Sequence, residues 1–401
     1  MQNFPIYFCF RFVFLFVSSL FILTPVQELI KSDLEQLNQE NNGVKPEERN
    51  KLDEKIVGIY RSALTHVQGS PAAKKSGHIW YRLLVGNLAD KIKNKPNLII
   101  IPDSVLYFIP FETLIDNRGH YLTQNHNISY TQSLSVLELI RQRNYKSDRK
   151  PIVAFGGAVY NQQTYKGSTV RNQAQLAYLQ KQVNHALQKG DSLQEYYAAL
   201  NRGGLSNLPG TLFEVNAIGK ILDNSDVLTG LDVSESKVKK MSASGVLDDY
   251  KVIHFATHGV VMPLIPELSA LVLSLSDTAN AKTGEDGYLR VSEIADLEIK
   301  ADFVNLSACQ TALGKLYKGE GVVGLTQSFL IAGANGMSVS LWPVADRSTA
   351  LFMTGLYSLV NEKKMSYAMA ITEVKRRFIE GKFGKQWQAP VFWAPFVYYG
   401  R

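Results

Sequence analysis

Residues 251–259 read KVIHFATHG and residues 303–310 read FVNLSACQ. In each stretch, an apolar run typical of a buried strand ends directly at a reactive side chain, His258 in the first and Cys309 in the second. Similar apolar runs alternate with helical patterns along the chain, which predicts βαβ units and a largely parallel sheet. Because parallel strands bring their carboxyl ends to one edge of a sheet, we expect the histidine and the cysteine at that edge.

The body of the chain is predicted to be an α/β unit with a mostly parallel central sheet flanked by helices. The predicted strands are Leu98–Ile101, Ile152–Phe155, Val252–Ala256, Ala270–Leu275, Phe303–Ser307, Gly336–Leu341 and Phe396–Tyr399. The predicted helices are Trp80–Ile92, Ser133–Arg143, Gln173–Gln188, Leu193–Leu200, Leu212–Leu222, Ser234–Met241, Gly321–Ala332, Ala345–Val360 and Ser366–Ile379.

Composition excludes several classes of protein. The 401 residues are 45% hydrophobic and 20% charged, which rules out collagen-like, disordered and polytopic membrane chains. The net charge of +7 is too small an excess for a nucleic-acid-binding stripe, so we expect no direct nucleic-acid partner. Cys9 and Cys309 are the two cysteines, too few for a disulfide framework or a thiolate metal cluster. The chain has no P-loop, GxGxxG fingerprint or EF-hand loop, so no cofactor and no metal are predicted.

An apolar leader precedes the body. Residues 4–26 are apolar apart from Arg11 and are long enough, at about 1.5 Å per helical residue, to cross a bilayer of about 30 Å. They predict a single uncleaved membrane anchor, since no basic region precedes the run. The basic residues that follow would leave the body in the cytoplasm. The alternative is a misplaced start or a truncated longer gene.

The leader, 1–27, is followed by a predicted helical neck over 28–70, with helices at Val26–Asn41 and Pro46–Val67. The body, 71–401, divides at a polar stretch into a first half (71–160), a variable insertion (161–207) and a second half (208–401).

The histidine and the cysteine fit nucleophilic catalysis. A thiol with a free pKa of about 8.5 needs a neighbouring base to supply the attacking thiolate near neutral pH, and His258 is placed to act as that base. The backbone N–H groups of Gly259 and Cys309 are candidate donors for the oxyanion of acyl transfer. His254 lies within the strand and is interpreted as a core histidine. A metal site from His254, His258 and Cys309 is disfavoured because HxxxH spacing needs a helix.

Short motifs spread in order along the body resemble the CHAT family of caspase-like peptidases, which are related in fold to separases and often attached to TPR repeats. The motifs are IPD (101–103), IPF (109–111), LPGT (208–211), IHFATHG (253–259), DGYL (286–289), NLSACQT (305–311), GEGV (319–322), AGA (332–334), SLWPV (340–344) and WAPF (393–396). The match runs from Ile79 to Arg401. No TPR array is recognisable in this chain.

The resemblance implies a caspase-like fold and a cysteine endopeptidase that uses a dyad of His258 and Cys309. It implies a protein or peptide substrate, cleavage after basic residues and control by a regulatory protein partner. A basic residue would need a pocket carboxylate, and the candidates are Asp346, Glu320 and Asp302, each of which also fits a surface or capping role. The alternative is a catalytically silent scaffold or signalling module. A serine hydrolase is set aside, because the chain has no GxSxG elbow.

Overall fold

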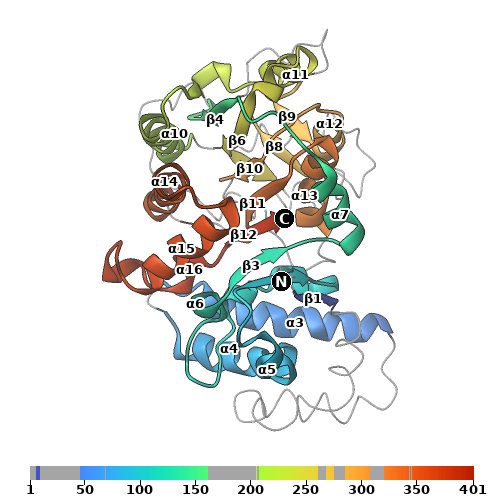
Figure 1. Ribbon diagram of the computed structural model, residues 1–401, viewed down its shortest axis with the longest axis vertical. Helices are drawn as coiled ribbons and strands as arrows, with labels where there is room; N and C mark the ends of the chain where they lie inside the picture. The colour runs from blue at the N-terminus through green and yellow to red at the C-terminus, as the bar shows by residue number, and fades with distance from the viewer. Residues whose placement is uncertain are drawn as a thin grey trace. The chain divides into compact units, whose positions relative to one another are not determined.

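A computed structural model describes residues 6–9, 46–67, 69–160, 205, 207–260, 268–274, 285–307, 320–342, 344 and 346–401. The chain divides into two compact units (Figure 1). The first unit comprises Met1–Leu139, Leu316–Gly319 and Ile371–Gly400, and the second comprises Ile140–Lys315, Glu320–Ala370 and Arg401.

In the described part of the first unit, four strands are joined by parallel pairing: β1 (Ile6–Cys9) with β2 (Asn97–Ile101), β2 with β3 (Asn127–Tyr130), and β3 with β12 (Phe396–Gly400). The apolar run of β2 is buried from Leu98 to Ile101, as expected for a parallel strand covered on both faces. The helices that lie wholly or partly in this unit are α3 (Pro46–Leu64), α4 (Pro71–Leu84), α5 (Ala89–Ile92), α6 (Leu122–Asn125), α7 (Leu134–Gln142), α15 (Tyr367–Ile379) and α16 (Pro390–Trp393).

Helix α3 packs into the first unit through one face. Val57, Tyr60 and Leu64 recur at helical spacing and are buried. The hydroxyl of Tyr60 lies 2.8 Å from the hydroxyl of Thr113, which fixes the helix to a turn of the unit. Helix α4 begins where Ser70 caps it by accepting the backbone N–H of Ala72.

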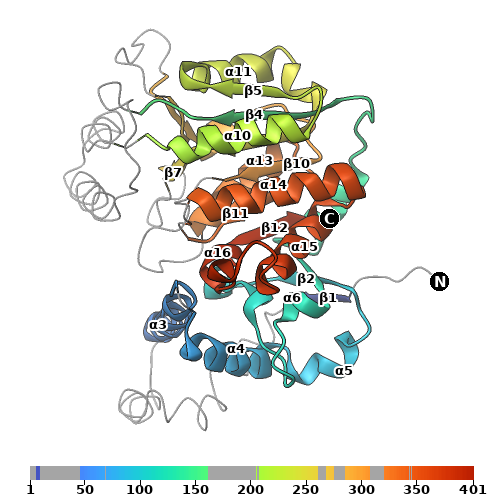
Figure 2. The same cartoon turned by 90° about the vertical axis from the view of Figure 1, so that its left-hand side faces the viewer.

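The second unit is built on a five-stranded parallel sheet in the order β5 (Asp226–Thr229), β4 (Lys150–Gly156), β6 (Tyr250–Ala256), β10 (Phe303–Leu306) and β11 (Gly336–Ser340). Among the residues that the structure describes, the helices lying wholly in this unit are α10 (Pro209–Ile221), α11 (Glu235–Ala243), α12 (Val291–Ala295), α13 (Glu320–Ala332) and α14 (Asp346–Lys363). Helices α10 and α14 lie side by side on one face of the sheet, and α12 and α13 lie together on the other (Figure 1); Figure 2 shows α10 and α14 in front of the strands. A separate antiparallel sheet joins β7 (His258–Val260), β8 (Ala270–Val272) and β9 (Tyr288–Arg290).

The core of the second unit is aromatic where β4 and β6 pair. The rings of Phe155 and Phe255 stack with centroids 4.9 Å apart, and Phe329 of α13 packs on Phe255. At the turn after α13, Gly333 has φ +124°, and a Cβ there would lie 1.8 Å from the carbonyl oxygen of Ile299. Only glycine therefore allows α13 to close onto this segment.

The predicted α/β class, with a mostly parallel sheet flanked by helices, is confirmed. The helix predicted over Trp80–Ile92 is wrong, because α4 ends at Leu84 and a separate turn at Gly86–Leu88 precedes α5. The strand predicted over Ala270–Leu275 shortens to β8 and joins the antiparallel sheet. Helices predicted at Gln173–Gln188 and Leu193–Leu200 lie outside the described residues.

The apolar leader departs from its prediction where the structure describes it. Residues 6–9 form β1 and pair with β2, so the predicted span over 4–26 is wrong for these residues, whose backbone is committed to a sheet. Residues 10–26 lie outside the described residues. Within the described part of the chain, no helix combines the length and apolarity that crossing a membrane requires. The predicted boundaries of leader, neck, halves and insertion stay predictions.

Candidate active site

His258 lies at the carboxyl edge of the parallel sheet in the second unit. Strand β6 ends at Ala256, the chain bends at Thr257, and His258 opens β7 as a buried residue. Seven successive residues of β6 bring the chain to this edge, and six of them are buried. The predicted strand end at the histidine is therefore confirmed.

Strand β10 runs parallel to β6 in a register that pairs Leu306 with Phe255. The backbone N–H of Ser307 extends this pairing by donating to the carbonyl oxygen of Phe255 at 2.9 Å. Cys309 follows Ser307 by two residues and lies outside the described residues, as do the N–H group proposed there as an oxyanion donor and the segment up to residue 319.

Gly259, the other predicted oxyanion donor, follows His258 in β7. It is buried and pairs with Leu271 in the register of β7 and β8. The three-stranded antiparallel sheet thus carries the histidine and the glycine on one short strand.

Tyr160 contacts His258 directly, a contact that the sequence did not indicate. The two rings lie with centroids 4.6 Å apart, inclined at 59°. The Tyr160 hydroxyl accepts the backbone N–H of His258 at 3.0 Å and donates to the carbonyl oxygen of Val272 at 3.1 Å. Tyr160 follows the carboxyl end of β4, so the candidate site draws residues from two adjacent strand ends.

Asp302 is not brought together with His258. It lies at the amino end of β10, where its backbone N–H donates to the carbonyl oxygen of Lys251, and both its carboxylate oxygens accept from the Arg149 guanidinium at 2.8 Å. Asp302 lies four steps along the chain before Leu306, the register partner of Phe255, which is about 13 Å at 3.3 Å per residue. Its carboxylate holds a structural ion pair at the opposite edge of the sheet.

Glu320 and Asp346 are the first residues of α13 and α14, and the structure does not describe their side chains. Helix α13 follows β10 in the chain, and α14 follows β11. In parallel βα units, a helix begins on the side of the sheet where the preceding strand ends. Both residues therefore start helices on the carboxyl side, which is the side of His258.

His254 is a buried core residue, as predicted. It points toward α10 and α14, its Nε2 lies 3.0 Å from a Glu214 carboxylate oxygen, and its Nδ1 lies 3.0 Å from the Tyr357 hydroxyl and 2.9 Å from Nδ2 of Asn305. Asn305 is its register partner on β10. This polar cluster ties the two strands that precede His258 and Cys309 to the helices covering them.

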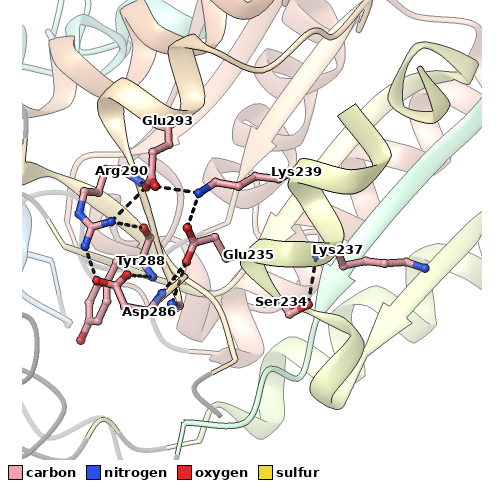
Figure 3. Close-up of polar contacts among 9 residues, drawn as sticks. Ser234, Glu235, Lys237, Lys239, Asp286, Tyr288, Arg290 and Glu293 are labelled. Carbon is pink, nitrogen blue, oxygen red and sulfur yellow. Dashed lines mark hydrogen bonds and ion pairs between the residues drawn. The ribbon is translucent and has the colours of Figure 1, made fainter. Parts of the chain in front are cut away.

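A second polar network holds the turn before β9. The buried carboxylate of Glu235 accepts the backbone N–H groups of Asp286 and Gly287 at 3.0 and 2.9 Å (Figure 3). Lys239 reaches between Glu235 and Glu293, at 2.5 and 2.8 Å. The DGYL motif thus forms an anchored turn, and Glu235 is a residue that sequence reasoning missed because its partners lie about 50 residues away.

Burial and neighbouring charges shift the pKa values in this network. Burial, with the Glu293 carboxylate nearby, raises the pKa of Glu235 despite its ion pair with Lys239. Burial tends to lower the pKa of Lys239, but the two carboxylates outweigh it and the pKa is raised. Burial tends to raise the pKa of Glu293, but the Lys239 ammonium and the backbone N–H of Arg290 outweigh burial, and the pKa is lowered. These shifts favour the charged forms of Lys239 and Glu293 and the neutral form of Glu235.

Among the described residues, no group of three or more His, Cys, Asp and Glu side chains is arranged to hold a metal ion. The expected absence of a metal and of a cofactor stays a prediction.

Comparison with known proteins decides the family. The profile of the CHAT domain matches residues 74–401. The chain belongs to the CHAT family. Among curated relatives, this CHAT chain is 29% identical over 167 residues to human tetratricopeptide repeat protein 28 and 28% identical over 167 residues to the mouse protein. The match covers 33% of this chain and 6% of each relative.

Solved structures that resemble this CHAT chain include separase in the Saccharomyces cerevisiae separase–securin complex, with a TM-score of 0.41 and 15% identity over 80% of this chain and 17% of that one. The Arg-specific cysteine proteinase gingipain R gives a TM-score of 0.42 and 11% identity over 79% of this chain and 66% of that one. A complex of the pro- and mature domains of Porphyromonas gingivalis RgpB gives a TM-score of 0.42 and 10% identity over 89% of this chain and 77% of that one.

Proposed function

We propose that this chain is a cysteine endopeptidase in which His258 and Cys309 form the catalytic dyad. The observation that carries the proposal is the register of β6 and β10. Leu306 pairs with Phe255, so His258 and Cys309 each follow a register-matched residue by three positions on adjacent parallel strands. The backbone N–H of Ser307 donates to the carbonyl oxygen of Phe255 at 2.9 Å. Cys309 comes two residues later, and two residues of chain span at most about 7 Å. Membership of the CHAT family supports the same assignment.

The chemistry follows from these two groups. The His258 imidazole takes the proton from the Cys309 thiol, and the resulting thiolate attacks the carbonyl carbon of the scissile peptide. The backbone N–H groups of Gly259 and Cys309 are the proposed donors to the oxyanion. The imidazolium then protonates the leaving amine, and water hydrolyses the thioester to release the acid and restore the thiol.

We also propose that the substrate is a protein with a basic residue before the scissile bond, and that a protein partner regulates the activity. A basic side chain needs a carboxylate at the carboxyl side of the sheet. Glu320 and Asp346 begin helices on that side, whereas Asp302 lies at the opposite edge paired with Arg149. This makes Glu320 and Asp346 the stronger candidates for the pocket.

The test uses the full chain, because β1 belongs to the sheet of the first unit. Wild type, Cys309→Ala and His258→Ala are each expressed in a host cell, and new protein termini are identified by mass spectrometry. We expect termini after Arg or Lys that both substitutions remove. Termini that persist in Cys309→Ala, or a complete lack of new termini with wild type, would favour the scaffold alternative.

Thiol labelling separates a silent dyad from an inert cysteine. Iodoacetamide should alkylate Cys309 of wild type faster near neutral pH than Cys309 of His258→Ala, because the imidazole stabilises the thiolate. Cys9 is replaced by Ser in both proteins so that a single thiol reports. Equal rates in the two proteins would refute the dyad even if a missing activator explained the lack of cleavage.

A further inference from the structure

The hydroxyl of Tyr160 bridges strand β7, which contains His258, and the neighbouring strand β8. His258 and Val272 are register partners of β7 and β8. The Tyr160 hydroxyl accepts the N–H of the first at 3.0 Å and donates to the carbonyl oxygen of the second at 3.1 Å. A phenol can do both at once, because its oxygen carries one proton and accepting lone pairs. The connection therefore reads N–H···O–H···O=C across the strand pair.

The ring of the same tyrosine restrains the imidazole. Its centroid lies 4.6 Å from that of His258, at an inclination of 59°, within the range of favourable aromatic contacts. Tyr160 is 7% exposed and His258 is 5% exposed. One side chain thus holds both the backbone and the ring of the histidine.

We infer that Tyr160 is a positioning residue for the His258 imidazole, holding the base at the height and tilt required to receive the thiol proton. The inference rests on the proposed peptidase function and adds to it a residue outside the dyad. Tyr160 contacts the proposed base, so its role is exerted through His258. The rate of a catalysed step depends strongly on how the reacting groups are placed, and a displacement of about 1 Å lowers it on the order of 100-fold.

Tyr160 is itself held at several points, which a positioning role requires. Three backbone N–H groups of its segment donate to side-chain oxygens: Gly157 to Thr211 at 3.0 Å, Val159 to Ser274 at 2.9 Å and Tyr160 to Asn207 at 2.8 Å. Ser274 also donates to the carbonyl oxygen of Gly230 at 2.7 Å. The segment is therefore fastened to α10, to the residues after β8 and to the turn after β5.

Gly157 allows the segment to make this approach. It has φ +64°, and a Cβ there would lie 2.9 Å from Cβ of Leu212 on α10. A side chain at this position would therefore push residues 157–160, and with them Tyr160, away from α10.

The test is Tyr160→Phe in the full chain, which keeps the ring and removes the hydroxyl. Tyr145→Phe is the matched control, because its hydroxyl donates to the carbonyl oxygen of Gly333 at 2.7 Å, in the same unit but at the turn after α13. Amide hydrogen exchange of the peptide that contains His258, and kcat and KM on a peptide taken from the cleavage sites found above, are measured for both.

We expect faster exchange at His258 in Tyr160→Phe, because a buried N–H loses its acceptor, together with a fall in kcat of about 10-fold to 100-fold at unchanged KM. The control should match wild type in both readouts. If Tyr160→Phe does not fold, Asn207→Ala loosens the Tyr160 backbone without touching the hydroxyl, and a smaller change in the same direction is expected.

Unchanged exchange at His258 in the folded variant overturns the inference, whatever the activity. Faster exchange with wild-type kcat also overturns it, since the hydroxyl would then be structural only. A wild-type chain that shows neither Cys309-dependent cleavage nor His258-dependent alkylation overturns the proposed function, and the positioning role falls with it. The wild-type measurements therefore distinguish the two failures.

Discussion

The first unit contains a buried ion pair whose removal has a calculable effect on stability. The Lys375 ammonium pairs with the Glu112 carboxylate, and their side chains are 1% and 2% exposed. The other carboxylate oxygen accepts the Tyr130 hydroxyl at 2.6 Å, and that hydroxyl accepts the N–H of Phe111 at 2.8 Å. Burial lowers the pKa of Lys375 even with the carboxylate beside it. The charge is therefore expensive to bury without its partner.

Replacing Glu112 by Gln removes the counter-charge and leaves the ammonium enclosed. Breaking a buried pair from one side costs about 3–5 kcal/mol, and Lys375→Met should cost a similar amount. The double variant Glu112→Gln, Lys375→Met leaves neither charge unpaired and should cost about 2 kcal/mol or less. Because a whole domain is stable by about 5–15 kcal/mol, either single change consumes a large part of the total.

Urea unfolding followed by tryptophan fluorescence measures these differences. Trp80, Trp387 and Trp393 belong to the first unit and Trp342 to the second, so a Trp342→Phe background makes the signal specific to the first unit. The control is Glu380→Gln, whose partner Lys382 is 60% exposed, and which should change the free energy of unfolding by less than about 1 kcal/mol. Single-variant losses below 1 kcal/mol, or a double variant equal to the sum of the singles, would refute the reasoning.

Three further predictions concern other buried groups. Although burial opposes it, backbone N–H donors hold the pKa of Asp116 below its usual value, so it stabilises the fold above about pH 4 and this contribution is lost as the pH falls through the lowered pKa. Asp116→Asn should therefore reduce the difference in unfolding free energy between pH 7 and pH 3, and an unchanged difference would contradict this. Glu235→Ala should cost about 2–4 kcal/mol and speed amide exchange at Gly287, since its buried N–H and the part-buried N–H of Asp286 lose their acceptor; unaltered exchange at Gly287 would count against the anchored turn. Gly333→Ala should cost more than about 2 kcal/mol in thermal or urea unfolding, and a neutral effect would show that the close approach to Ile299 is not required.

Much of the fold could be predicted because buried parallel strands are nearly continuous apolar runs. The runs at Leu98–Ile101, Ile152–Phe155 and Phe303–Ser307 match strands to within two residues at either end. Strands β3, β5, β7 and β9 were not predicted. They are three or four residues long, and their polar residues leave no periodic signal.

The apolar leader shows how one pattern fits two environments. Residues 6–9 are as apolar as a membrane span, yet they add a strand beside β2. Hydrophobicity reports that a segment avoids water, and both a bilayer and a covered sheet satisfy that requirement. The partner strand lies about 90 residues away in the chain, so the local sequence does not contain the information that decides between them.

The sequence by itself determined the family, the α/β class and the two strands that precede His258 and Cys309 in the chain, because these depend on local apolar runs and short motifs. Only the tertiary structure decided that Asp302 lies at the far edge with Arg149, that Glu235 holds the DGYL turn, and that Tyr160 packs on His258. Each of these contacts joins residues about 50 to 150 positions apart. Strand order and burial decide which groups meet, and the sequence around a carboxylate or hydroxyl does not indicate its distant partner.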